Sequence, residues 1–158
     1  MLFTLRPARR DDWPFVWALR VATMRPLIER TYGWDEAMQR TFAEASLRGR
    51  VAELHDDVHG VHDARVGVLT VLDWEREHHL AWIAVIPTLQ GRGLGAALVR
   101  IAQREAHEAM KPLTLQVLAE NRAARFYERL GFVREPHDDA LWVKMRWTAP
   151  NDPSAKSA

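Results

Sequence analysis

The chain has 158 residues, a formal net charge of +1 and no cysteine. This length predicts one compact domain, and the near-neutral charge gives no electrostatic case for nucleic-acid or membrane partners. The lack of cysteine excludes disulfides, thiolate catalysis and thiolate metal sites. No apolar run approaches the length of a membrane span, and residues 1–6 lack a signal-peptide pattern. We therefore expect a cytoplasmic protein.

The first third of the chain is expected to be one strand followed by helices. Alternating apolar residues predict a strand over 2–6. Asp11 or Asp12 is a suitable cap for a helix that runs to about residue 23. Pro26 suits the first turn of a second helix that ends near residue 33.

Asp35 is expected to cap a third helix, which Gly49 closes. The residues 51–55 and 65–72 are then expected to pair as a hairpin across a polar connection. The side chains expected to face inward from the third helix are Met38, Phe42 and Ala45.

Strands and helices alternate in the second half. The expected elements are a strand over 77–86 that Pro87 ends, a helix over 93–110, a strand over 113–118, and last strands near Val133 and over 141–147. Residues 148–158 are rich in Pro, Ser, Asn and Ala and are expected to form a flexible tail. The domain is therefore expected to span residues 1–147.

A glycine-rich segment, Gln90 to Ala96, separates the expected strand over 77–86 from the next helix. Glycine lets the backbone curl without Cβ clashes, so successive N–H groups can converge on one point. The start of a helix adds unpaired N–H donors and the positive end of its dipole. This combination is typical of a phosphate or pyrophosphate site.

A second motif follows the strand over 113–118. It reads Asn-x4-Phe-Tyr-x3-Gly-Phe, from Asn121 through Phe126 and Tyr127 to Gly131 and Phe132. Asn121 is a suitable helix cap, and Gly131 stands where a left-handed residue ends a helix. The motif therefore predicts a short helix between two strands.

With both motifs in this order, the chain resembles the GNAT superfamily of acyl-CoA-dependent N-acetyltransferases. The Q-x-x-G-x-G signature corresponds to Gln90, Gly93 and Gly95, and the second signature to the residues from Asn121 to Phe132. The resemblance implies a single-domain α/β fold with a mixed central sheet of about seven strands flanked by helices. It also implies two parallel strands that splay apart at the cofactor site. The implied activity is direct acetyl transfer from acetyl-CoA to a primary amine in a ternary complex.

The resemblance also implies which residues bind acetyl-CoA. Strand backbone groups would hold the pantetheine arm as a pseudo-strand, and loop N–H groups would hold the pyrophosphate. The residues implied are Ile83, Ala84, Val85, Gln90, Gly91, Arg92, Gly93, Leu94, Gly95, Ala96, Asn121, Arg125 and Tyr127.

The chemistry needs an acid and a base. Tyr127 is the implied acid for the departing thiolate, and the N–H of Val85 is the implied oxyanion donor. Members of the family often carry a glutamate base, but His79 occupies the matching position here. Glu77 lies on the same strand face and is an alternative base or a partner that orients the ring. A third alternative is that the free amine is drawn from solution.

Tyr32, Trp34 and Asp35 are expected to line the acceptor site, because aromatic and acidic groups suit a cationic amine. The acceptor is expected to be an amine-bearing small molecule, peptide or protein, and the chain a monomer or homodimer.

Three other interpretations remain. A non-catalytic acyl-CoA sensor on the same scaffold would keep the cofactor loop without the catalytic residues. Histidines and carboxylates over 55–63 have spacings that suit zinc, but a solvated loop is expected there, and no metal is expected. The spacing Gly91-x-Gly93-x-x-Ala96, with Glu120, formally fits dinucleotide binding, but Pro87 to Gln90 separates the glycines from their strand.

Overall fold

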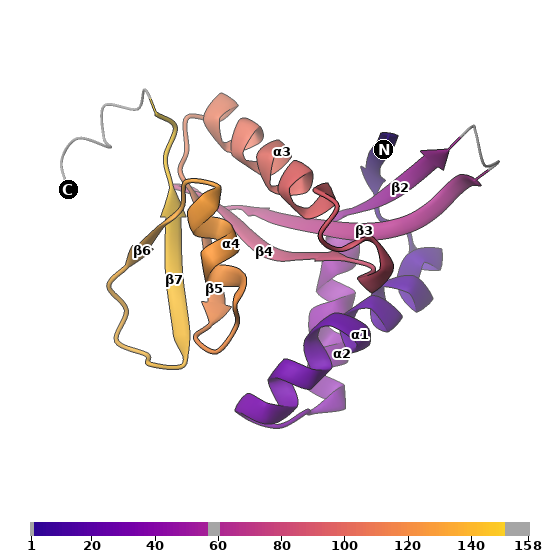
Figure 1. The fold of residues 1–158 in the computed structure, drawn as a ribbon, viewed down its shortest axis with the longest axis horizontal. Coiled ribbons are helices and arrows are strands. Elements are labelled where there is room, and N and C mark those ends of the chain that lie inside the picture. Colours follow the sequence, from indigo (N-terminus) through magenta and orange to yellow (C-terminus); the bar gives the residue numbers. More distant parts are fainter. Residues whose placement is uncertain (1, 57–60, 151–158) are drawn as a thin grey trace. The chain divides into compact units, whose positions relative to one another are not determined.

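The computed structural model describes residues 2–56 and 61–150, with only the backbone described for residues 55, 56 and 61–63. It contains two compact units. The first comprises Met1–Thr70 and Trp82–Gly95, and the second Val71–Ala81 and Ala96–Ala158. The strands form a seven-stranded mixed sheet in the order β1-β2-β3-β4-β5-β7-β6 (Figure 1). The predicted α/β fold is confirmed.

The first unit combines an antiparallel sheet with two helices. Its strands are β1 (Leu2–Pro7), β2 (Arg50–Asp56), the longer part of β3 (Val61–Asp73) and the second half of β4 (His78–Val85). Strand β1 is antiparallel to β2, and β2 is antiparallel to β3. Its helices are α1 (Trp13–Thr31) and α2 (Glu36–Ala45), with short 3-10 turns at Arg10–Asp12, Ser46–Arg48 and Pro87–Leu89. The predicted first strand and hairpin are confirmed.

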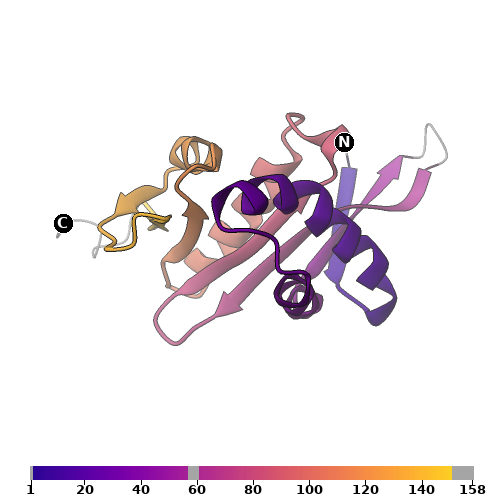
Figure 2. The same ribbon diagram turned by 90° about the horizontal axis from the view of Figure 1, so that it is seen from below.

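The core of the first unit lies between the two helices and the sheet. Val16 and Leu19 of α1 and Ala43 of α2 pack with Val68 of β3 and Trp82 of β4. Figure 2 shows α1 and α2 together over these strands. The helices are therefore held by apolar burial, which is the main stabilising term for such layers.

The prediction of two helices before residue 33 is wrong, because α1 continues through Pro26 to Thr31. A proline inside a helix removes one hydrogen bond and costs about 3 kcal/mol. Ile28, which follows Pro26, is almost completely buried. Burial of this last part of the helix offsets the cost of the proline.

The inward face predicted for α2 is also wrong. Asp35 caps the helix as expected, since its Oδ1 accepts a hydrogen bond from the N–H of Met38 at 2.9 Å. However, Met38 and Phe42 are 48% and 49% exposed, and Gln39 and Ala43 are the buried residues. The apolar residues predicted the wrong face of α2, because the buried face contains a glutamine, Gln39, whose side chain has a buried hydrogen-bond partner.

A buried carboxylate joins the N-terminal elements of the first unit. Asp12 is fully buried and accepts hydrogen bonds from both Nη atoms of Arg6 and from the N–H of Arg9. Arg65 adds an ion pair at 2.7 Å. The hydrogen bonds from Arg6 are the main reason that the pKa of Asp12 falls to about 2. This charge is fully compensated inside the unit.

The second unit is built around β5. It contains α3 (Leu94–Glu108) from Ala96 onward, β5 (Leu113–Leu118), α4 (Ala123–Arg129), β6 (Val133–Glu135) and β7 (Trp142–Trp147). Strand β5 is parallel to β4 and antiparallel to β7, and β6 is antiparallel to β7. The predicted strand over 113–118 and the last two strands are confirmed.

The end of α4 has the geometry that the second motif predicts. Gly131 has a φ of +89°, and its N–H donates to the carbonyl of Glu128 at 3.0 Å. The N–H of Phe132 donates to the carbonyl of Tyr127 at 3.1 Å. These two bonds form a Schellman motif, for which glycine is favoured because only it adopts a positive φ without a steric cost. The start of β6 is thereby placed against the end of the helix.

Within the described ranges, no helix is long and apolar enough to cross a bilayer. The described part of the chain also holds no group of three or more potential metal ligands. The side chains over 55–63, for which zinc was considered, lie outside the described ones, as do residues 151–158 of the predicted tail.

Candidate functional site

The glycine segment of the first unit is an open turn between the end of β4 and the start of α3. Gly91 and Gly93 have φ values of +74° and +88°, and no atom lies within 4 Å of where a Cβ would be. The side-chain amide of Gln90 donates to the carbonyl of Val85 at 3.0 Å, which ties the turn to the strand. The backbone at these glycines is thus exposed and unobstructed, as an anion site requires.

The remaining cofactor residues expected in this unit lie beside that turn. Ala84 and Val85 are buried near the end of β4, and Ile83 is half-buried. The N–H of Ile86 donates to the carbonyl of Val66 in β3. Leu94 is buried and opens α3, whereas Arg92 is exposed. The turn is therefore anchored on both sides by buried apolar residues.

In the second unit, Asn121 and Tyr127 are held by different means. The Oδ1 of Asn121 accepts from the N–H of Ala123, the first residue of α4, at 2.9 Å. The N-cap position is Arg122, one residue later than predicted. Tyr127 is 6% exposed, and its ring contacts Phe126 and Phe132 in edge-on arrangements. Burial raises the pKa of the Tyr127 phenol, so this group stays protonated at neutral pH. A protonated phenol can donate a hydrogen bond or a proton.

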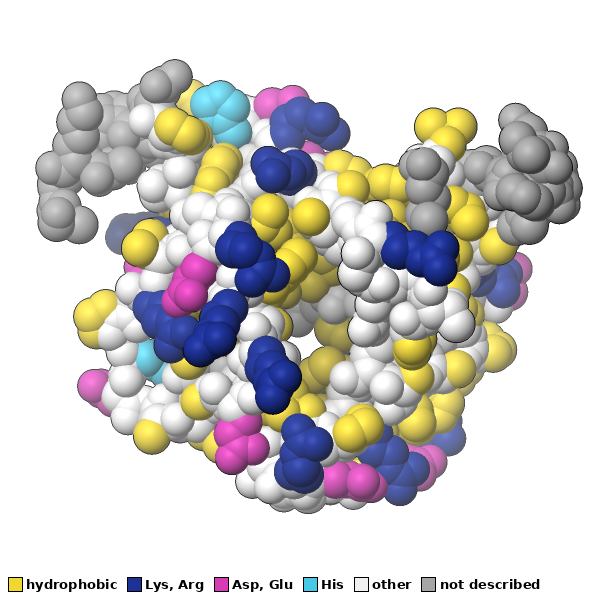
Figure 3. Space-filling view, viewed as in Figure 1, with side chains coloured by type: hydrophobic (Ala, Val, Ile, Leu, Met, Phe, Trp, Pro, Cys, Tyr) yellow, Lys and Arg dark blue, Asp and Glu magenta, His cyan; other side chains and the backbone are white. Residues whose placement is uncertain are grey.

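Exposed arginines lie on α3 and around α4 in the second unit. Lys and Arg side chains gather on the face of the molecule that Figure 3 shows. The exposed arginines of α3 and of the α4 region are Arg100, Arg104, Arg122, Arg125 and Arg129. Arg125, which was expected to contact the cofactor, belongs to this set. Exposed arginines of this kind are able to contact the phosphates of a polyanionic ligand.

The two candidate bases lie on one hydrogen-bonded network in the second unit. Thr114 of β5 is fully buried, and its hydroxyl lies 2.9 Å from Oε1 of Glu77 and 3.0 Å from Nδ1 of His79. The carbonyl of His78 is a more distant partner at 3.4 Å. The parallel register of β4 and β5 places His79 opposite Thr114. We call these three side chains, Glu77, Thr114 and His79, the Glu-Thr-His relay.

The number of protons available fixes which groups of this relay donate hydrogen bonds and which accept them. A threonine hydroxyl has one proton and an ionised carboxylate only accepts, so Thr114 donates to Glu77. The hydroxyl oxygen then accepts from His79, which requires the proton of the neutral ring to be on Nδ1. The Nε2 atom is left with a free lone pair. His79 is therefore set up to accept a proton at Nε2.

Four further groups surround the relay. The ring of Trp74 is stacked on His79 with centroids 4.4 Å apart. Arg146 of β7 donates to Oε2 of Glu77 at 3.2 Å and also pairs with Glu135 of β6. Burial lowers the pKa of His79 and Lys144 lowers it further, while Glu77 opposes both. His79 therefore remains neutral to lower pH than an ordinary histidine.

Thr114 and Arg146 were not among the predicted site residues. A fully buried threonine in an otherwise apolar strand is a usable signal, because a buried hydroxyl needs a hydrogen-bond partner. Its partners are His79 of β4 and Glu77, which directly precedes β4, both more than 30 positions earlier in the chain. The register that joins them is a tertiary property.

The residues expected to line the acceptor site already have contacts in the first unit. Trp34 packs against Trp17 with centroids 6.0 Å apart, and the guanidinium of Arg25 lies 5.6 Å from its ring. Asp35 caps α2 through Oδ1, and Tyr32 is 46% exposed. Of the two aromatic rings, that of Tyr32 is therefore the more exposed.

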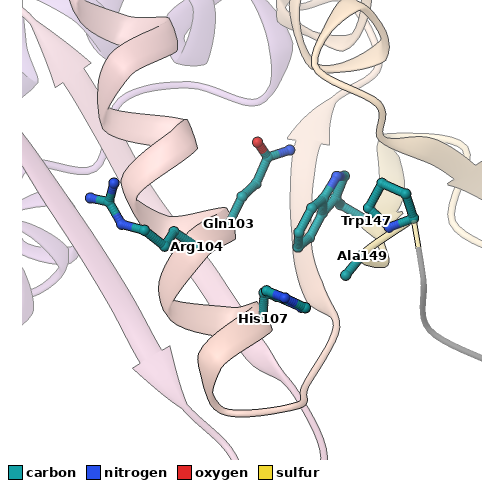
Figure 4. A pocket seen from close by; sticks show the side chains of 6 residues that line it. Gln103, Arg104, His107, Trp147 and Ala149 are labelled. Atoms are coloured by element: carbon teal, nitrogen blue, oxygen red, sulfur yellow. The ribbon is translucent and has the colours of Figure 1, made fainter.

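The second unit also contains a pocket of about 280 Å³ near the end of α3 (Figure 4). It is lined by Gln103, Arg104, His107, Trp147, Ala149 and Pro150. Gln103 donates to the carbonyl of Leu130, and none of the predicted site residues lines this pocket. We therefore assign no role in the chemistry to it.

Comparison with known proteins identifies the family. The acetyltransferase (GNAT) domain model matches residues 49–134, more than half of the chain. The chain therefore belongs to the GNAT acetyltransferase family. A search of curated proteins found no match.

Solved structures agree with this fold. The PaiA N-acetyltransferase from Thermoplasma acidophilum in complex with coenzyme A is 14% identical with a TM-score of 0.68, covering 94% of this chain and 100% of that one. The ribosomal-protein-S18-alanine N-acetyltransferase from Escherichia coli is 23% identical with a TM-score of 0.64, covering 95% and 98%. Arabidopsis thaliana Naa50 in complex with the bisubstrate analogue CoA-Ac-MVNAL is 13% identical with a TM-score of 0.67, covering 94% and 100%. At these identities the likeness concerns the fold.

The relay predicts the tautomer and titration of His79. In ¹⁵N NMR spectra, neutral His79 should be protonated at Nδ1 and should titrate below the ordinary pKa of about 6.5. Thr114→Val removes the hydroxyl at nearly constant volume, so we expect the Nδ1–H form to lose its preference. Thr70→Val is the matched control, since it also replaces a buried threonine, on β3.

The same shift has a consequence for stability. Because the folded pKa of His79 is below the unfolded one, the unfolded chain binds more protons between the two values. Stability should therefore rise with pH through this window and fall as the pH drops below about 6.5. Denaturant unfolding at a series of pH values measures this change in stability.

In the ¹⁵N spectra, a neutral wild-type His79 ring protonated at Nε2 would contradict the proposed roles in the relay.

Proposed function

We propose that this chain transfers an acetyl group from acetyl-CoA to a primary amine, directly and without a covalent enzyme intermediate. The Glu-Thr-His relay carries this proposal, because a sensor that only binds acyl-CoA has no need for a base with a defined free lone pair. The open Gly91–Gly93 turn supports the cofactor part. The experiment is a screen of small amines and peptides for release of free CoA.

In the proposed reaction, Nε2 of His79 removes a proton from the ammonium form of the acceptor. The free amine nitrogen attacks the thioester carbonyl and forms a C–N bond. The N–H of Val85 is the proposed donor to the resulting oxyanion. The C–S bond then breaks as the phenol of Tyr127 gives its proton to the departing thiolate. The new amide nitrogen loses its remaining extra proton to the phenolate, and His79 releases its proton to solvent. The products are the N-acetylated acceptor and CoA.

The burial of Tyr127 suits the proposed acid. A thiol such as CoA has a pKa of about 8.5 by analogy with cysteine, so its thiolate leaves more readily with a hydrogen-bond donor nearby. Because burial raises the pKa of Tyr127, the phenol is present in its donor form throughout the neutral range. Phe126 and Phe132 restrict the ring, which reduces the entropy that must be lost on reaction.

The cofactor part predicts a specific sensitivity at Gly93. Gly93→Val should weaken CoA binding at least tenfold, because a β-branched residue disfavours a φ of +88° and the turn would change shape, with a cost of about 1–3 kcal/mol. Calorimetry with CoA is the measurement. Gly33→Val is the matched control, since Gly33 has a φ of +89° and equally open surroundings in the same unit. Equal loss of CoA affinity in both variants would contradict the role of the turn.

The acid part predicts a loss of turnover in Tyr127→Phe. This change keeps the ring packing and removes the hydroxyl, so the rate should fall by about 10²–10⁴-fold while CoA affinity is retained. Steady-state kinetics with the best acceptor from the screen, together with calorimetry, would test it. A turnover number near that of the wild type would leave Tyr127 as a packing residue.

The base part predicts a change in the pH–rate profile. His79→Gln should lower turnover by about 10²–10⁴-fold and remove an acidic limb that lies below pH 6.5 in the wild type. His78→Gln makes the same change one residue earlier on the strand and should keep the limb. If Glu77→Gln moves the limb and His79→Gln does not, the base is Glu77. An unaltered profile in both would mean that the amine loses its proton in solution.

A further inference from the structure

The first unit contains an arginine whose charge is buried. Arg20 of α1 is 8% exposed. Its Nε and Nη2 atoms both donate to Oε1 of Gln39 in α2, at 2.9 and 2.7 Å. The guanidinium carbon lies 5.3 Å from the ring centre of Phe42 and 5.4 Å from that of Trp82. The group is therefore fixed between α1, α2 and β4.

No carboxylate pairs with Arg20 among the residues that the structure describes. Neighbouring arginines on the same helices are paired, Arg25 with Glu29 at 2.6 Å and Arg40 with Glu36 at 3.0 Å. Those pairs are exposed, whereas a buried charge normally needs a partner of opposite sign. Burial lowers the pKa of Arg20 to about 10, so the group remains a cation at neutral pH.

Two hydrogen-bond donors on residues beside Arg20 lack acceptors among the described residues. The side-chain amide nitrogen of Gln39 and the indole nitrogen of Trp82 are buried, with no hydrogen-bond partner in the described part of the chain. Both residues contact the guanidinium. Unpaired buried donors cost free energy unless a ligand or water satisfies them. The missing partner is therefore an acceptor, and beside a cation it is best an anion.

The geometry limits which anion fits. Gln39 occupies the side of the guanidinium formed by Nε and Nη2. The remaining N–H groups, on Nη1 and Nη2, form a planar fork, which matches the two oxygens of a carboxylate. Trp82 directly precedes Ile83, one of the three β4 residues proposed to hold the pantetheine arm. A group bound at Arg20 would thus lie in the same unit as that strand segment.

We propose that Arg20, together with Gln39 and Trp82, binds a carboxylate of the acceptor, so that the acceptor is a small amine that also carries a carboxylate. This inference rests on the proposed function, because it names the class of amine that is acetylated. Arg20 is a binding residue here and takes no part in proton transfer.

The test measures binding separately from turnover. Unbranched amino carboxylates of increasing chain length are titrated into the CoA-bound protein by calorimetry, each compared with the alkylamine of the same length. The wild type should bind at least one amino carboxylate ten or more times as tightly as its matched alkylamine. The acetyl-transfer screen is then run with the same compounds.

Two variants locate the effect. Arg20→Met removes the charge at similar length and should abolish the preference for the carboxylate, and Arg20→Lys should reduce it, because an ammonium lacks the planar fork. Arg40→Met is the matched control, since Arg40 also lies over a tryptophan ring but is exposed and paired with Glu36. Thermal unfolding verifies that each variant is folded. Should Arg20→Met not fold, the comparison of Arg20→Lys with the wild type decides.

The outcomes separate this proposal from the function on which it rests. Acetyl transfer to amines without any preference for a carboxylate would overturn the carboxylate site and leave the function standing. Arg20-dependent binding of amino carboxylates without transfer would support the site and overturn the function. Equal binding of acetate or chloride and of the amino carboxylates would show a counter-ion site only, and this also overturns the proposal.

Discussion

The short parallel pairing of β4 with β5 is the constraint on which the chemistry of the second unit depends. It joins His78, His79 and Leu80 to Leu113, Thr114 and Leu115, although both strands extend further. Facing residues in such a ladder point to the same side, so a shift of one position would separate His79 from Thr114. The antiparallel pairing of β5 with β7 places Arg146 opposite Thr114 in the same way. Three strands thus contribute to one polar cluster through register alone.

The buried carboxylates of both units have partners that compensate their charge, whereas one buried arginine does not. In the second unit, Glu77 has a hydroxyl and a guanidinium as partners, so the charge of this carboxylate is compensated without any ligand. In the first unit, Asp12 is fully compensated by Arg6 and Arg65. Arg20 is the exception, because among the described residues its hydrogen-bond partner is a neutral amide. Since most buried polar groups are satisfied, this exception is informative about what the first unit binds.

The glycine turn and the end of α4 show which local features a sequence can predict. Gly91, Gly93 and Gly131 all adopt a positive φ, as motifs that need glycine imply. Local hydrogen bonding likewise makes Asp35 the cap of α2 as expected, and the Asn121 side chain bonds the first N–H of α4. The inward face of α2 was mispredicted, because the Gln39 amide is buried against a guanidinium from another helix and hydropathy alone cannot indicate this.

Apart from the division of α1 into two helices, the sequence alone determined the order of strands and helices, the glycine turn and the family resemblance. Each of these depends on residues close together in the chain. It also singled out His79, Glu77 and Tyr127 as candidates for the chemistry. Only the tertiary structure decided that Thr114 links the two candidate bases and that Arg146 pairs with Glu77. It also decided that Arg20 is buried with no carboxylate partner among the described residues. These contacts join residues 19 to 69 positions apart. Strand register and helix packing bring them together, and neither is set by local preference.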